Sequence, residues 1–156
     1  MSAPVQLNSL FTKEVSVIDG STTAPTKGSP AVDLLTYVVM GPVMLLNWQF
    51  EEDTGAEAGS GAYLLKIPGG YSIQSDFVSI GTGTHANIVG SCSVIDSAGT
   101  PVDLQGYVIA YNATHVAMVV NKSLIGSAHL GLDSSDAPVK YSLQAVLPIA
   151  GRNYLY

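Results

Sequence analysis

The stretch Gly59-Ser60-Gly61-Ala62-Tyr63-Leu64-Leu65-Lys66-Ile67-Pro68-Gly69-Gly70-Tyr71-Ser72-Ile73 decides the fold class. Its Gly/Ser-rich beginning leads into a short apolar segment, Ala62–Ile67, of the kind that forms a strand. Pro68-Gly69-Gly70 stops that strand, because proline removes a backbone donor and glycine favours turns. Tyr71 then opens another extended segment. The stretch therefore predicts short strands that are separated by tight turns.

The same alternation of strand and turn runs through the rest of the chain. Residues 34–40 and 43–50 flank Gly41-Pro42, which predicts a β-hairpin. No segment after residue 15 has its apolar residues spaced as in an amphipathic helix. The other expected strands are residues 62–67, 71–80, 86–95, 107–111, 116–120, a weaker 124–132, and 139–147.

About eight short strands at this spacing are typical of an all-β protein, and we expect a jelly-roll β-sandwich. This domain is expected to span residues 15–156. Residues 1–14 have loosely spaced apolar side chains, as in a short helix or an ordered arm, and are predicted to form an N-terminal arm that docks on a partner.

The composition predicts contact with other protein chains. Hydrophobic residues make up 47% of the 156 residues and charged residues only 12%, about half of the ~25% share that is usual in globular proteins. Exposed apolar patches usually mark interaction sites, and exposed edge strands must be covered. We therefore expect a homo-oligomer or an assembly component, with a neutral surface rich in Ser and Thr as the alternative.

Charge and cysteine usage exclude several classes of function. The net charge is −6 and the six Lys and Arg residues are scattered, which argues against nucleic acid and anionic membranes as partners. The longest apolar run, Tyr37–Leu46, is too short for a membrane-spanning helix. The single cysteine, Cys92, is expected to pack as a small apolar residue. The N-terminus does not have the pattern of a signal peptide, so we expect a soluble protein made in a cytoplasm.

The chain carries no recognisable catalytic motif, so we expect neither an enzyme nor a cofactor. Gly81-Thr82-Gly83-Thr84 has the spacing of a relaxed dinucleotide-binding motif, but strand-like residues follow it instead of a helix. His85, His115 and His129 are the only histidines. One of them near a threefold axis could present three imidazoles to a metal, but structural histidines and no metal site are expected. The acidic residues 51–57 are expected to form a solvated face rather than a calcium site.

Four segments carry a resemblance to a known family. They are Thr23–Gly28 followed by Val32-Asp33, then Gly59–Ile73, Val108–Thr114, and Tyr141–Gly151 near the chain end. These segments resemble the jelly-roll module found at the C-terminus of bacteriophage tail fibres and in phage capsid decoration (cement) proteins. The resemblance covers roughly residues 20–151 and rests on strand and turn sequences, not on a catalytic signature. Arg152–Tyr156 extends beyond the point where the family usually ends.

The resemblance implies a trimeric structural protein of a virion. Since an arm of residues 1–14 could supply an interface but not a stalk, we expect a capsid decoration protein rather than a fibre tip. Its homotrimers would bridge and stabilise neighbouring capsomers by binding the phage major capsid protein. It would be synthesised in the host bacterial cytoplasm and located on the capsid surface of the virion. The alternative is the receptor-binding tip of a tail fibre or head fibre that recognises host-surface glycan.

Specific residues follow from these roles. Leu7, Leu10 and Phe11 are expected to contact the capsid, because they are the large apolar side chains of the arm. Three further residues are predicted to pack between the subunits of a trimer, namely Val38, Trp48 and Tyr111. A third hypothesis is a free-standing carbohydrate-binding module whose tyrosines line a sugar-binding surface, although aromatic residues within strands usually pack in a core or an interface.

Overall fold

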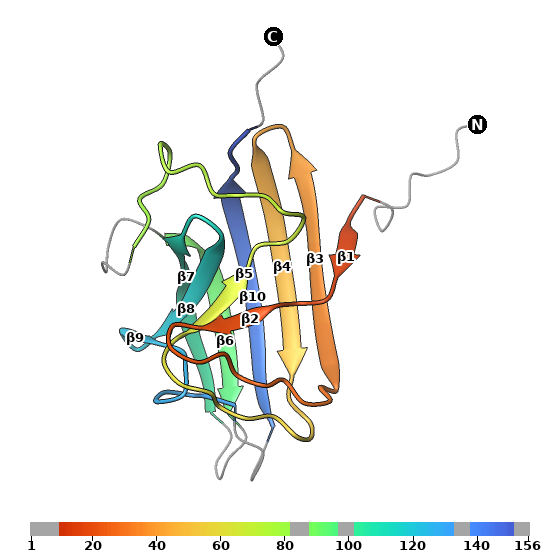
Figure 1. Ribbon diagram of the computed structural model, residues 1–156, viewed down its shortest axis with the longest axis vertical. Coiled ribbons are helices and arrows are strands. Elements are labelled where there is room, and N and C mark those ends of the chain that lie inside the picture. Colours follow the sequence, from red (N-terminus) through yellow and green to blue (C-terminus); the bar gives the residue numbers. More distant parts are fainter. Residues whose placement is uncertain (1–9, 82–87, 97–101, 133–137, 152–156) are drawn as a thin grey trace, which may run out of the picture.

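The structure, a computed structural model, describes residues 10–81, 88–96, 102–132 and 138–151. Within these ranges the protein is all-β and contains no helix, as the sequence predicts. Ten antiparallel strands form one sheet (Figure 1). The strands are β1 (Thr12–Glu14), β2 (Ile18–Gly20), β3 (Val32–Met40), β4 (Val43–Glu51), β5 (Tyr63–Lys66), β6 (Ile88–Asp96), β7 (Val102–Asn112), β8 (His115–Val120), β9 (Ser123–Leu124) and β10 (Val139–Pro148).

The sheet curls around a single main core. Its strand order is β1-β3-β4-β10-β6-β7-β8-β5-β2, with β9 paired to β8. β1 and β2 lie at opposite ends of this order, yet only the short segment from Glu14 to Ile18 joins them. Four residue steps span at most about 14 Å, so the two ends of the sheet must approach each other. The backbone N–H of Lys66 in β5 also donates to the carbonyl of Val17, at 3.0 Å.

The predicted hairpin at Gly41-Pro42 is confirmed. β3 and β4 pair from Met40 opposite Val43 to Val32 opposite Glu51. Successive side chains of a strand point to opposite faces, and buried and more exposed residues alternate along β4. β10 pairs with β4 on one side and with β6 on the other, so it is an interior strand of the sheet.

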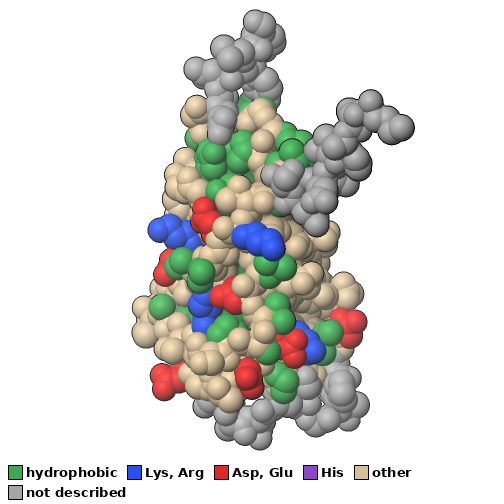
Figure 2. Space-filling view, turned by 90° about the vertical axis from the view of Figure 1, so that its right-hand side faces the viewer, with side chains coloured by type: hydrophobic (Ala, Val, Ile, Leu, Met, Phe, Trp, Pro, Cys, Tyr) green, Lys and Arg blue, Asp and Glu red, His purple; other side chains and the backbone are tan. Residues whose placement is uncertain are grey.

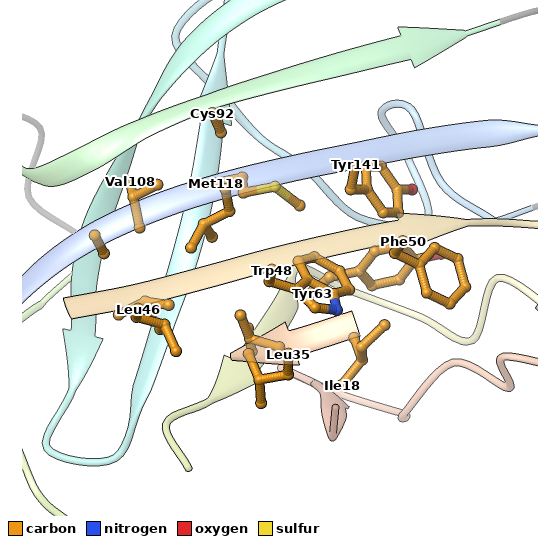
Figure 3. Close-up of a cluster of buried hydrophobic side chains, with 14 of the residues drawn as sticks. Ile18, Leu35, Leu46, Trp48, Phe50, Tyr63, Cys92, Val108, Met118 and Tyr141 are labelled. Carbon is orange, nitrogen blue, oxygen red and sulfur yellow. The ribbon is translucent and has the colours of Figure 1, made fainter. Parts of the chain in front are cut away.

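The core is built on aromatic side chains of β4 and β10. The ring of Trp48 lies 5.7 Å from that of Phe50 and 5.9 Å from that of Tyr141, measured between centroids (Figure 3). Trp48 is only 1% exposed. The prediction that Trp48 packs between subunits is therefore wrong: the indole fills the interior of one protomer and presents no surface to another chain.

A second apolar cluster lies on the opposite face of β5, β7 and β8. Leu64, Ile109, Ala117 and Val119 are its buried members, and each alternates along its strand with a residue of the main core. Tyr111 packs against this cluster and is partly buried. This half of the sheet therefore has apolar side chains on both of its faces.

Three predicted segments differ in the structure. Residues 71–80 form no strand, because the segment crosses the ends of other strands: Ile73 N–H donates to Ala113 O, and Ala150 N–H donates to Ser72 O. In residues 124–132 only the first residue belongs to a strand, β9, and Leu130 has a positive φ of 52°. At the other end of the chain Thr12–Glu14 pairs with β3, so the sheet begins inside the segment expected to be the arm.

Candidate functional site

The outer face of β1, β3, β4, β10 and β6 carries a groove of about 830 Å³, which we call the outer groove. It lies on the side of these strands that faces away from the core. Its polar lining consists of Lys13, Thr36, Asn47, Gln49, Ser91 and Gln144. Its apolar lining includes Phe11, Leu45, Val89 and Val146.

The polar side chains of the groove form a row across four strands. Thr36 pairs with Asn47, Asn47 with Gln144, and Gln144 with Ser91. Directly paired residues point to the same face of a sheet. The amide side chains of Asn47 and Gln144 make no hydrogen bond to other residues within the described ranges, so their donors and acceptors are available to a ligand. The same is true of Gln49, two residues further along β4.

One end of this face is apolar, and we call it the apolar end. It consists of Phe11, Val38, Met40, Val43, Leu45 and Val146. Met40 and Val146 are 54% and 56% exposed, respectively, although both are large apolar side chains. Figure 2 shows hydrophobic side chains gathered near the upper end of that view, whereas charged side chains lie in its middle and lower parts. The apolar end is therefore a surface that could be buried by another protein.

Charge is confined to the borders of the outer groove. Among the described residues, Lys13 on the edge strand β1 is the only charged one that lines the groove. Further along the same face, beyond the groove, Lys140 Nζ pairs with Glu51 Oε1 at 3.1 Å. The central rows of the face are thus neutral, hydrogen-bonding and concave.

His115 forms a separate polar cluster at the turn between β7 and β8. Its Nε2 lies 2.7 Å from Asp19 Oδ2, and its Nδ1 lies 2.9 Å from Thr114 Oγ1. A hydroxyl, an imidazole and a carboxylate in line could in principle activate a nucleophile. However, Asn112 Oδ1 accepts the Thr114 N–H at 2.9 Å and lies 3.2 Å from the Thr114 hydroxyl. These contacts build the turn and tie it to β2, so the cluster serves as a structural clip.

Two tyrosines hold loops against the core. The Tyr63 hydroxyl donates to Ala58 O at 2.8 Å and accepts the Leu132 N–H at 3.0 Å, and the Tyr141 hydroxyl donates to Leu130 O at 2.6 Å. Burial raises the pKa of Tyr63 and holds the pKa of Tyr141 well above its ordinary value. Both hydroxyls therefore stay protonated and can donate. Neither ring lies on a surface where it could stack on a sugar, because both side chains are almost fully buried.

The described part of the chain contains neither a cluster of metal-binding side chains nor a membrane-spanning helix. No group of three His, Cys, Asp or Glu side chains there lies close enough to hold a metal ion. His129 has a buried Nε2 without a hydrogen-bond partner, and His85 lies outside the described residues. Cys92 is buried, as predicted, and burial raises the pKa of its thiol to about 11. Among the described residues no helix is long and apolar enough to cross a membrane.

The residues predicted from sequence to contact the capsid or another subunit differ in how they lie relative to the outer face. Leu10 and Phe11 are 52% and 40% exposed, and Phe11 lines the outer groove. Val38 lies on the same face in β3 and is half-buried. Leu7 lies outside the described residues.

Asn47, Gln49 and Gln144 were not predicted from the sequence. Their signal was the occurrence of polar side chains at alternate positions in two largely apolar segments, Asn47 and Gln49 in one and Ser142 and Gln144 in the other. The pairing of β4 with β10, far apart in sequence, is what brings them together.

Comparisons with known proteins add no family to this picture. No family model matches the chain, and no curated protein and no solved structure match it either.

Proposed function

We propose that the protein is a structural, non-enzymatic component of a bacteriophage virion, a capsid decoration (cement) protein. Its homotrimers would bridge neighbouring capsomers on the capsid surface and bind the major capsid protein. The observation that carries the proposal is the apolar end, where the exposed side chains of Met40, Val146 and Phe11 lie on the outer face. Burying one such side chain contributes about 1.5–3 kcal/mol, so a few of them could hold a subunit on a capsid.

The four segments that resemble phage virion modules form one connected part of the fold, which supports the proposal. Thr23 bridges to Ser60, which links the first segment to the second. Ile67 N–H donates to Thr114 O, which links the second to the third. Ile73 bridges to Ile149, which joins the second to the fourth.

The curled sheet is compatible with a jelly roll, which is an antiparallel sandwich of two layers. In this interpretation β1, β3, β4, β10 and β6 form one layer, and β7, β8, β5 and β2 form the other. Side chains from both groups of strands meet in the main core. For the packing between subunits we propose Val38 and Tyr111, both of which are only partly buried in the protomer.

The proposal is tested by placing charge on the apolar end. The double variant Met40→Lys/Val146→Lys should fold normally, because both side chains are more than half exposed. It should fail to bind capsids of the encoding phage that have been assembled without this protein. Phe77→Lys is the matched control, since Phe77 is 71% exposed and does not belong to the apolar end. Capsid binding by the double variant as tight as that of the wild type would refute the role of this surface.

The second candidate is the receptor-binding tip of a tail fibre or head fibre, and the outer groove favours it. A neutral groove with unpaired amides is suited to a host-surface glycan. Labelled protein that binds host cells and not capsids would support this function over capsid decoration. Sedimentation at micromolar concentration tests the trimer that both functions require.

A further inference from the structure

We propose that the outer groove is a binding site for an uncharged oligosaccharide. The inference rests on the second candidate function and deepens it, because it names the class of glycan that the polar rows of the sheet face would bind. The two surfaces lie on the same strands, but the polar row of Asn47 and Gln144 is two residues away from that of Leu45 and Val146. The two surfaces share Phe11, Leu45 and Val146, but a saccharide would also hydrogen-bond to Asn47 and Gln144, which do not belong to the apolar end.

The chemistry of the lining matches that of a neutral sugar. Each saccharide hydroxyl both donates and accepts a hydrogen bond, and so do the side chains of Asn, Gln, Ser and Thr. Asn47, Gln49 and Gln144 offer amides whose hydrogen bonds are not used within the described ranges. A charged saccharide finds no matching set of opposite charges in the described part of the lining, where Lys13 is the only ionic residue.

The dimensions of the polar row suit a short chain of sugar rings. Neighbouring strands lie about 4.8 Å apart, so the row from Thr36 to Ser91 across β3, β4, β10 and β6 spans roughly 14 Å. A second row, containing Gln49 and Ser142, runs parallel to it two residues further along the strands. Phe11, which is 40% exposed, lines the groove and supplies an aromatic side chain on which the C–H groups of a sugar could pack.

The side chains of the outer groove differ from those of an ordinary solvent-exposed sheet face. Such faces usually carry charged side chains, and this face does so where Glu51 pairs with Lys140. In the groove the charges are replaced by amides and hydroxyls, and the surface is concave.

The test is calorimetric titration of the full chain with neutral hexasaccharides of glucose and of N-acetylglucosamine. An oligogalacturonate hexamer serves as the acidic control. At least one neutral hexamer should bind, and the acidic hexamer should bind at least about tenfold more weakly. The double variant Asn47→Ala/Gln144→Ala should lose about tenfold or more in affinity, since it removes two amide contacts. Gln74→Ala is the matched control and should bind as the wild type does, because Gln74 is no part of the groove lining.

Three outcomes would overturn the inference. Folded wild-type protein could fail to bind either neutral hexamer at millimolar concentration. The Asn47→Ala/Gln144→Ala variant could bind as tightly as the wild type. Finally, this variant could change the sedimentation of the protein, which would make the groove an interface between copies of the chain. Capsid binding by the same variant should be unchanged, so a failure here is distinguishable from a failure of the virion proposal.

Discussion

Replacing Tyr63 with phenylalanine tests how the loops are held on the curled sheet. The hydroxyl of Tyr63 contacts two loops, because it donates to Ala58 O and accepts the Leu132 N–H. The hydrogen bond to Leu132 is buried, so its removal leaves an N–H without an acceptor. The aromatic ring itself is retained in Tyr63→Phe, and the packing of the core should therefore change little.

The magnitude follows from these two hydrogen bonds. An orphaned buried donor costs about 1–3 kcal/mol, and the loss of the bond to the half-buried Ala58 carbonyl adds roughly 0.5–1 kcal/mol. Tyr63→Phe should thus lower the free energy of unfolding by about 2–4 kcal/mol. At about 2–4 °C for each kcal/mol in a domain of this size, the Tm should fall by roughly 5–15 °C.

Urea unfolding of three variants measures the effect. Tyr141→Phe removes one bond, that to Leu130 O, and should cost about 1 kcal/mol. Tyr107→Phe is the control, because the Tyr107 hydroxyl makes no hydrogen bond within the described residues, and it should change stability by less than about 0.5 kcal/mol. Equal losses for Tyr63→Phe and Tyr107→Phe, with unchanged m values, would refute the assignment of Tyr63 as a link between the loops.

Three other perturbations have defined outcomes. Burial raises the pKa of Cys92 from an ordinary value of 9.0 to about 11. Because the pKa is raised, the contribution of the thiol to the free energy of unfolding is complete below pH 9, and about 3 kcal/mol of it is lost as the pH rises to about 11. Cys92→Ala should remove this part of the pH dependence in unfolding titrations. Asp19→Asn weakens the contact with His115. Since the Asp19 side chain is 44% exposed, the free energy of unfolding measured with denaturant should fall by only about 1 kcal/mol. An unchanged free energy of unfolding would mean that this contact does not stabilise the fold. Gly90→Ala places a Cβ 1.9 Å from Gln144 O, so β6 must shift. Amide hydrogen exchange at the β6–β10 pairing should therefore accelerate. Protection equal to that of the wild type would contradict the close approach of the Gly90 and Gln144 backbones.

The sequence was sufficient for the fold class and for the strands with a strong local signal. The hairpin around Gly41-Pro42 is an example, because its turn and its alternating apolar residues lie within one continuous stretch. The segment 71–80 misled the prediction because its β-type residues pack singly over strand ends, as Ile73 does on Ile149. Local propensity does not show whether an extended segment will find a partner strand.

The outer groove could not be predicted from the sequence because it depends on pairing over long distances. Asn47 and Gln144 are nearly one hundred positions apart, and only the register of β4 with β10 makes them neighbours. Trp48 illustrates the opposite error: an aromatic residue in a strand can face the core or a partner, and its sequence position alone does not choose between them. The alternation along β4 makes the choice, because Trp48 shares a face with Leu46 and Phe50.

The structure also changes what the low charge of this chain implies. A shortage of charged residues first suggests that much of the surface is covered by other proteins. On the described outer face, however, the uncharged area has two chemically different parts. Around Met40 and Val146 it is apolar and gains free energy when another protein excludes water. Around Asn47 and Gln144 it is rich in unused hydrogen-bonding groups, which would lose water without compensation against an apolar partner. We therefore propose a protein partner for the first part and, for the second, a ligand that brings its own hydroxyl groups.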